Sequence, residues 1–188
     1  MLKLLQEFEE LFDGTLGDWD CNTVSLQLKE GAQPYHGRLF PIPKNMWRQK
    51  EEIQRLCNLE VLKWQADSEW ASPTFIIPKK DNTVRVVSDF REINKRIVRK
   101  PFPIPKISTV LQELEGFTYA TALDLNMGYY TIRLDPDASK MCTIILPWGK
   151  YSYLRLPMGV ACSSDIFQAK MSHHFASPRV AWMTISVN

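Results

Sequence analysis

Apolar and polar positions follow helical spacing in the first part of this 188-residue chain. Five leucine and phenylalanine side chains in residues 2–12 share one helical stripe, which predicts a short amphipathic helix ended by Asp13-Gly14. In residues 21–43, apolar and polar residues first alternate weakly and the chain then becomes rich in proline, which predicts a strand or an extended arm. Residues 44–63 are rich in helix formers and predict a second, longer helix.

Strand-like spacing dominates the middle of the chain. Residues 73–78 and 84–88 are short apolar runs joined by a basic loop, which predicts a hairpin. After several prolines, residues 108–116 predict a helix that begins at a serine cap and ends at a glycine. Residues 117–126 then predict a strand that carries the carboxylate of Asp124.

Further strands are predicted at residues 131–135, 141–146 and 151–156, with turn residues between them. Consecutive short strands of this kind favour an antiparallel meander. A helix from about Ser164 to Phe175 follows. These elements predict an α+β fold, and the chain length allows one to two compact units.

Asp124 is the residue that most strongly indicates chemistry. Side chains alternate across a strand, so Ala120, Ala122 and Asp124 share one face and leave open space beside the acid. A lone carboxylate on an apolar strand is costly to bury, so Asp124 either meets solvent or holds a cation. The alternative is an ordinary aspartate that starts a turn at a strand end.

Composition narrows the class of protein. The hydrophobic content is 45%, yet no stretch reaches the apolar length of a membrane span, and the N-terminus is too acidic for a secretory signal. We therefore expect an intracellular protein, in a compartment that the sequence leaves open. The four cysteines are scattered singly and the three histidines complete no zinc pattern, so we expect reduced and mostly buried thiols.

Charge is distributed unevenly. Residues 1–20 hold six acids against one lysine, whereas residues 79–106 hold nine basic residues against three acids. A basic segment suits a polyanion, although a charge run is equally explained by a solvated face. The basic segment lies just before the Asp124 strand, which makes it of interest as a candidate binding surface.

Several ordered motifs together resemble a reverse transcriptase, and most closely the polyproteins of Ty3/gypsy-type long-terminal-repeat retrotransposons. The motifs are Ser72-Pro-Thr-Phe-Ile-Ile-Pro-Lys-Lys-Asp81, Arg85, Asp89-Phe-Arg-Glu-Ile-Asn94, Leu123-Asp-Leu with Tyr129, Gly149-Lys-Tyr-Ser-Tyr153, Leu156-Pro-Met-Gly159 and Phe167-Gln168. The resemblance implies an N-terminal helix and arm at residues 1–30, partial fingers and palm at 31–172 with an antiparallel sheet, and a divergent tail at 173–188.

The family's chemistry is RNA-directed DNA polymerisation, in which a primer 3′-hydroxyl attacks the α-phosphate of a deoxynucleoside triphosphate on two Mg²⁺ ions. By resemblance, Asp124 is the first metal-binding aspartate, and the main-chain carbonyl of Leu125 is a further metal ligand. Lys79 and Arg85 match the residues that hold the triphosphate. The implied partners are an RNA or DNA template–primer and a dNTP.

Two more residues match the nucleotide site. Tyr129 matches the aromatic beneath the incoming sugar, where a ring excludes a 2′-hydroxyl, although core packing is the commoner role of a tyrosine. Met158 is expected to pack against the nucleotide without a hydrogen bond. Asp89 and Arg91 are assigned to fold stability. Glu60 replaces a family glycine after a helix, where a left-handed backbone would cost on the order of 1 kcal/mol.

The tail departs from the family, because no acid follows Asp165 where an aromatic-x-Asp-Asp hairpin supplies the second metal-binding carboxylate. One hypothesis is an out-of-frame translation: Trp182-Met183-Thr184 requires the bases TGGATGAC, which give Asp-Asp when read two bases later. The thumb, connection and RNase H segments are also missing from the sequence. We therefore expect the isolated chain not to extend a primer. The alternative function is an inactive fragment that at most binds nucleic acid, or a decayed gene product.

Overall fold

The computed structural model describes the greater part of the chain. The described residues are 2–19, 22–40, 47–80, 83–103, 106, 108, 109, 112, 116, 118 and 125–174. They belong to two compact units, one formed by Met1–Val98 with Leu125–Val160 and the other by Arg99–Asp124 with Ala161–Asn188. All strands of the sheet described below lie in the first unit.

The sheet of the first unit has five strands in the order β1-β5-β4-β2-β3. Their bounds are β1 Leu62–Trp64, β2 Ser72–Pro78, β3 Val84–Ser88, β4 Thr143–Leu146 and β5 Gly149–Tyr153. Neighbouring strands are antiparallel except β2 and β4, which run parallel with Ser72 opposite Ile144. The predicted hairpin at residues 73–88 is therefore confirmed. Of the predicted meander, the last two strands form an antiparallel pair, and the parallel pairing of β2 with β4 joins it to the hairpin in one sheet.

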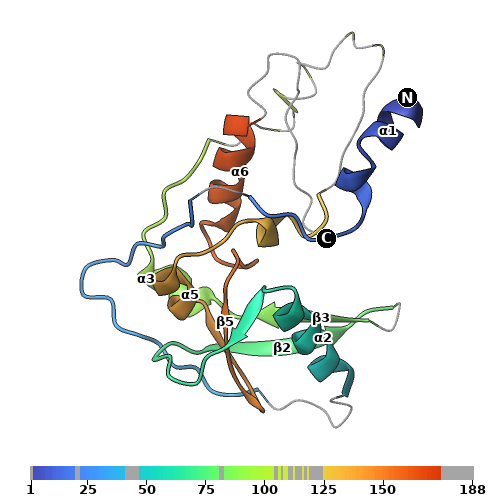
Figure 1. Ribbon diagram of the computed structural model, residues 1–188. Coiled ribbons are helices and arrows are strands. Elements are labelled where there is room, and N and C mark those ends of the chain that lie inside the picture. The colour runs from blue at the N-terminus through green and yellow to red at the C-terminus, as the bar shows by residue number, and fades with distance from the viewer. Residues whose placement is uncertain are drawn as a thin grey trace. The chain divides into compact units, whose positions relative to one another are not determined.

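Helix α2, Trp47–Asn58, packs beside β1 and β3 in the first unit (Figure 1). Its core face contains Ile53 and Leu56, which are 2% and 3% exposed. The predicted helix at 44–63 is thus shorter than expected, because the chain turns at Glu60 and enters β1. Glu60 has φ of 53°, so the expectation of a left-handed residue after this helix is confirmed.

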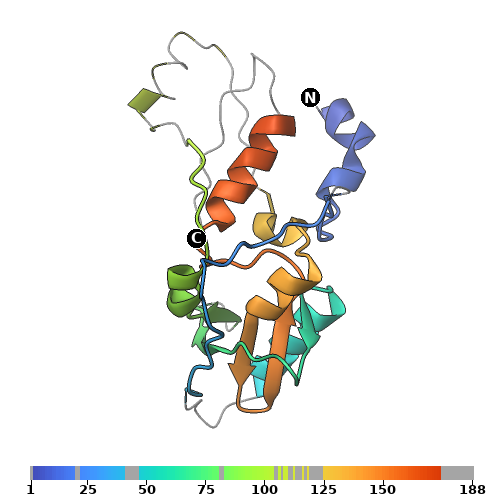
Figure 2. The same ribbon diagram turned by 90° about the vertical axis from the view of Figure 1, so that its left-hand side faces the viewer.

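The prediction of a strand at residues 131–135 is wrong. The segment begins as a 3₁₀ turn, η2, Gly128–Thr131, and continues with isolated bridges from Arg133 and Leu134. A helix then follows that the sequence did not indicate, α5, Pro136–Met141, which leads directly into β4 (Figure 2). Its N-terminus is capped by the Asp135 carboxylate, which accepts a 2.7 Å hydrogen bond from Ala138 N.

The N-terminal residues form helix and arm, as predicted. The helix is divided into α1, Leu2–Glu7, and a 3₁₀ turn η1, Glu9–Phe12, and the side chains of Leu5, Phe8, Leu11 and Phe12 are exposed. The arm makes isolated bridges from Val24, Leu28 and His36, which confirm an extended segment packed along the first unit. The helices in the described part of the chain are all too short or too polar to cross a bilayer.

The second unit contains helix α6, Ser163–His174, close to the helix predicted at 164–175. Phe167 and Met171 are buried, 2% and 5% exposed, as the helical spacing indicated. Asp165, also buried, accepts hydrogen bonds from the Arg99 guanidinium and from Phe102 N. The helix predicted at 108–116 lies largely outside the described residues, as does the strand predicted at 117–126, including Asp124.

Candidate functional site

The basic hairpin is held by regular strand pairing. Arg85 on β3 lies opposite Ile77 on β2, and Lys79 N donates a 2.8 Å hydrogen bond to Thr83 O across the loop. The Lys79 side chain is exposed and Arg85 is half-buried. Among the described residues, no carboxylate is paired with either of these two cations.

Tyr129 lies in the turn η2, whose backbone is fixed at several points. Met127, before the turn, has a left-handed backbone with φ of 52°, and Tyr130 N donates to its carbonyl over 2.8 Å. The Thr131 hydroxyl donates to Gly128 O at 2.7 Å. Tyr130 is buried and Tyr129 only half-buried, so the turn keeps the second tyrosine in the core and leaves the first more accessible.

Met158 is positioned by helix α3, Arg91–Arg96. The Asn94 side-chain amide donates a 2.9 Å hydrogen bond to the carbonyl of Gly159, the residue after Met158. Gly159 has φ of 90°, a conformation that favours glycine, and a Cβ there would lie 3.6 Å from the Phe90 ring. The turn that presents Met158 is thus fixed by the Asp89–Asn94 motif, and Met158 itself is half-buried.

Asp89 and Arg91 organise the start of α3. The Arg91 guanidinium forms an ion pair of 2.6 Å with the Asp89 carboxylate, which also accepts from Arg91 N. The hydrogen bonds from Arg91 lower the pKa of Asp89. Asp89 N in turn donates to Pro73 O of β2 at 2.8 Å. These local contacts agree with the scaffold role expected from the sequence.

A polar network inside the unit connects the strands to the Tyr129 turn. The Thr74 hydroxyl donates to Ser88 Oγ at 3.3 Å, and Ser88 Oγ lies 3.4 Å from the Tyr153 hydroxyl. The Tyr153 ring stacks on the Tyr130 ring with centroids 6.1 Å apart. Burial raises the pKa of both tyrosines. The strand that carries Arg85, strand β5 and the turn are therefore parts of one packed structure.

The structure places Lys79, Arg85, Leu125, Tyr129 and Met158 in the same compact unit, whereas Asp124 lies outside the described residues. Leu125 is 42% exposed. Within the described ranges no group of three or more His, Cys, Asp and Glu side chains could hold a metal.

Positioning residues were missed from the sequence, among them Asn94 and Tyr153. Both residues belong to motifs that the sequence indicated. Their hydrogen-bond partners, Gly159 and Ser88, are distant in the sequence, and the spacing of residues along the chain does not predict such contacts.

Comparison with known proteins identifies the family. The family model for reverse transcriptase (RNA-dependent DNA polymerase) matches residues 77–187. The retrovirus-related Pol polyprotein from transposon opus of Drosophila melanogaster is 32% identical over 174 residues, which cover 88% of this chain and 17% of that polyprotein. The transposon Tf2-3 polyprotein of Schizosaccharomyces pombe is 29% identical over 132 residues, 70% of this chain and 10% of the polyprotein. The chain thus spans a small part of these relatives.

Solved structures show the same fold. The native protease–reverse transcriptase of prototype foamy virus superimposes with a TM-score of 0.81 at 22% identity, over 95% of this chain and 24% of the viral chain. The foamy viral enzyme in complex with an RNA/DNA hybrid gives a TM-score of 0.75 at 20% identity, over 91% and 23% of the respective chains. This confirms the predicted α+β, reverse-transcriptase-like architecture. The chain belongs to the reverse transcriptase family, and its relatives are the Pol polyproteins of Ty3/gypsy-type retrotransposons.

Proposed function

We propose that this chain forms the nucleotide-binding fingers and palm of an RNA-directed DNA polymerase encoded by a retrotransposon. The observation that carries the proposal is the hairpin of β2 and β3, which presents Lys79 and Arg85 without an ion-pair partner among the described residues. Two cations on one hairpin are suited to a triphosphate, because lysine acts as a point charge and arginine can contact phosphate oxygens in bidentate fashion.

Tyr129 and Met158 are the proposed contacts to the sugar and the base of the nucleotide. The Tyr129 ring excludes a 2′-hydroxyl and so selects deoxynucleotides, and Met158 packs against the nucleotide without hydrogen bonding to it. Their support is the turn that leaves Tyr129 more accessible than Tyr130, and the Asn94 contact that fixes the Met158 turn. The sugar and the base are then recognised by shape, and the phosphates by charge.

Magnesium ions belong to the same proposal. The Asp124 carboxylate and the Leu125 carbonyl are hard oxygen donors, the type that Mg²⁺ prefers, and the bound ions would neutralise charge on the reacting oxygens. A second metal requires further carboxylates, and no Asp or Glu follows Asp165 in the sequence. We therefore propose that the isolated chain binds nucleotide and nucleic acid but does not extend a primer.

A template–primer duplex is the proposed macromolecular partner. Foamy viral enzymes of the same fold are described in complex with double-stranded DNA and with an RNA/DNA hybrid. Lys79, Lys80 and Arg85 of the β2–β3 hairpin supply charge of the sign that such a duplex requires. If the chain is instead a decayed gene product without a binding function, it should retain neither nucleic acid nor nucleotide.

Salt-dependent binding of an RNA/DNA hybrid tests the proposal. Each phosphate contact adds roughly one unit to the slope of log K against log salt, so the Lys79→Ala, Arg85→Ala double variant should lose about two units. Lys63→Ala, which removes an exposed lysine from β1, is the charge control and should leave the slope close to that of the unmodified chain. Absence of binding at low salt would contradict the proposal.

Primer extension tests the catalytic part. Purified chain, primer–template, dNTPs and Mg²⁺ should yield no extended product. Extension that Asp124→Asn abolishes would show that the chain is a polymerase by itself and that its second metal is held by other groups.

A further inference from the structure

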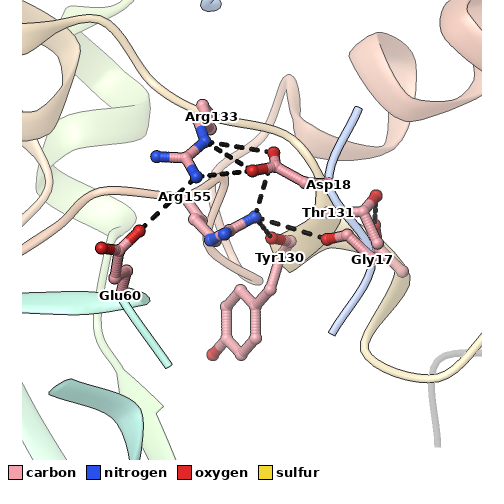
Figure 3. Close-up of polar contacts among 8 residues, drawn as sticks. Gly17, Asp18, Glu60, Tyr130, Thr131, Arg133 and Arg155 are labelled. Carbon is pink, nitrogen blue, oxygen red and sulfur yellow. Dashed lines mark hydrogen bonds and ion pairs between the residues drawn. The ribbon is translucent and has the colours of Figure 1, made fainter. Parts of the chain in front are cut away.

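The arm residues before β1 contact the turn that carries Tyr129. Trp19 N donates a 2.9 Å hydrogen bond to Thr131 O at the end of η2, and Val24 N donates to Arg133 O at 2.9 Å. Asp18 directly precedes Trp19, and its carboxylate points toward Arg133 and Arg155 (Figure 3). The arm therefore joins the turn through both its backbone and a carboxylate.

Arg155 is the centre of this contact. Its side chain is 6% exposed, and Nη1 donates to Tyr130 O at 3.0 Å and approaches Asp18 Oδ1 at 3.3 Å and Gly17 O at 3.4 Å. Its Nε is buried and has no hydrogen-bond partner among the described residues. A buried guanidinium is costly unless a carboxylate compensates its charge, and Asp18 is the carboxylate that reaches it.

Asp18 divides its hydrogen bonds between a buried and an exposed arginine. Arg133 Nε donates to Asp18 Oδ2 at 2.9 Å, while the Arg133 side chain is 45% exposed and also reaches Glu60 at 3.5 Å. Figure 3 shows the Asp18 carboxylate bonded to both Arg133 and Arg155, with Arg155 also reaching the Tyr130 carbonyl. Arg133 thus offers a matched control, because it shares the carboxylate without a contact to Tyr130.

We propose that Asp18 and Arg155 are positioning residues that hold Tyr129 in place for the incoming nucleotide. Arg155 donates a hydrogen bond to the carbonyl of Tyr130, the residue that follows Tyr129. The backbone of the turn that carries Tyr129 is therefore tied to the arm through Arg155 and Asp18. The inference rests on the proposed function, to which it adds the N-terminal arm as a determinant of sugar selection.

The first measurement follows the turn without any nucleotide. Hydrogen exchange of the full chain, read by mass spectrometry, should show the backbone amides of residues 127–134 exchanging about tenfold faster in Asp18→Asn. The double variant Asp18→Asn, Arg155→Met should show the same change. Because it leaves no buried unpaired charge, it controls for unfolding caused by such a charge. Residues 84–96 should keep their protection, and Arg133→Gln should change residues 127–134 less.

The second measurement compares equilibrium binding of a dNTP and the matching rNTP in the presence of Mg²⁺. The unmodified chain should prefer the dNTP, and the Asp18 and Arg155 variants should narrow that preference by about fivefold, equivalent to one hydrogen bond. Lys79→Ala should instead weaken both nucleotides alike.

The outcomes separate the two proposals. Unchanged exchange at residues 127–134 would overturn the positioning role. Faster exchange with an unchanged dNTP preference would overturn the link to sugar selection. If the unmodified chain binds neither nucleotide, the proposed function fails together with the selectivity part of the inference, while the exchange data still decide whether Asp18 and Arg155 hold the turn.

Discussion

The side chain of Asn94 donates a 2.9 Å hydrogen bond to the main-chain carbonyl of Gly159 and so joins helix α3 to the turn that carries Met158. The donor and the acceptor belong to separate motifs of the family, Asp89–Asn94 and Leu156–Gly159. The bond fixes the backbone of the turn that includes Met158, the proposed nucleotide contact.

Replacing Asn94 by alanine should lower the free energy of unfolding by about 1 kcal/mol, because the Gly159 carbonyl loses its donor. Urea denaturation measures the change. Asn58→Ala is the control, since the Asn58 amide oxygen accepts a hydrogen bond from Gln54 within the same helix and joins no distant segments. Equal effects of the two substitutions would contradict a specific role for Asn94.

Alanine at Gly149 should destabilise the protein more than alanine at Gly159. Both glycines have positive φ, 149° and 90°, so each substitution strains the backbone. A Cβ at Gly149 would also lie 2.1 Å from the Trp64 ring, whereas at Gly159 the nearest atoms are 3.6 Å away. Thermal unfolding should show the larger loss for Gly149→Ala. Near-ultraviolet circular dichroism should report the displaced Trp64, which packs edge-on against Tyr151.

The Arg99–Asp165 pair should make the second unit sensitive to acid. The hydrogen bond from Arg99 Nε, 2.7 Å long, lowers the pKa of Asp165, and Phe102 N adds to the effect. Because the folded pKa is the lower one, the contribution is complete above the unfolded pKa of about 3.9 and is lost as pH falls through the folded pKa.

Arg99→Ala tests this linkage. It leaves the Asp165 carboxylate buried with Phe102 N as its remaining described donor, so stability near neutral pH should fall and its acid dependence should weaken. Unfolding measured at a series of pH values between about 7 and 2 gives both quantities. An unchanged pH profile would show that the pair makes no net contribution.

Tyr153→Phe should destabilise the first unit by about 1 kcal/mol, because Ser88 and Tyr130 lose a buried hydroxyl partner. Burial raises the pKa of Tyr153, so its contribution is complete below the unfolded pKa of about 10 and is lost as pH rises through the folded pKa. Ultraviolet difference spectra should show less alkaline sensitivity in the variant. A variant as stable as the unmodified chain would contradict the network.

Elements with strong periodicity were predictable from the sequence. The hairpin of β2 and β3 and helix α6 follow the spacing of their apolar residues, and the α+β class follows from them. Helix α5 was missed because Pro136 was interpreted as a break, whereas it occupies the first turn after the Asp135 cap, where its missing N–H costs nothing. A proline that directly follows a capping residue can therefore begin a helix instead of ending a regular element.

The error at residues 131–135 has a different cause. Their alternation is that of a strand, but Thr131 completes the η2 turn and the following residues pair only at isolated bridges with the arm and with Arg155. Those partners come from distant segments, so the pattern of residues 131–135 contains no information about them. The Asp18–Arg155 contact was not predicted for the same reason: its two residues are distant in the sequence, and the arm shows only a weak pattern of apolar residues.

The parallel pairing of β2 with β4 also sets an order of assembly. Ser72 pairs with Ile144, so β2 and β3 can close their hairpin long before β4 has left the ribosome. Until then Ser72 and Pro73 lack the β4 partners that they have in the folded chain, and closing so long a loop has an entropic cost that slows the step. The nascent chain is therefore most open to mispairing with another molecule along β2, in the interval between synthesis of the hairpin and synthesis of β4.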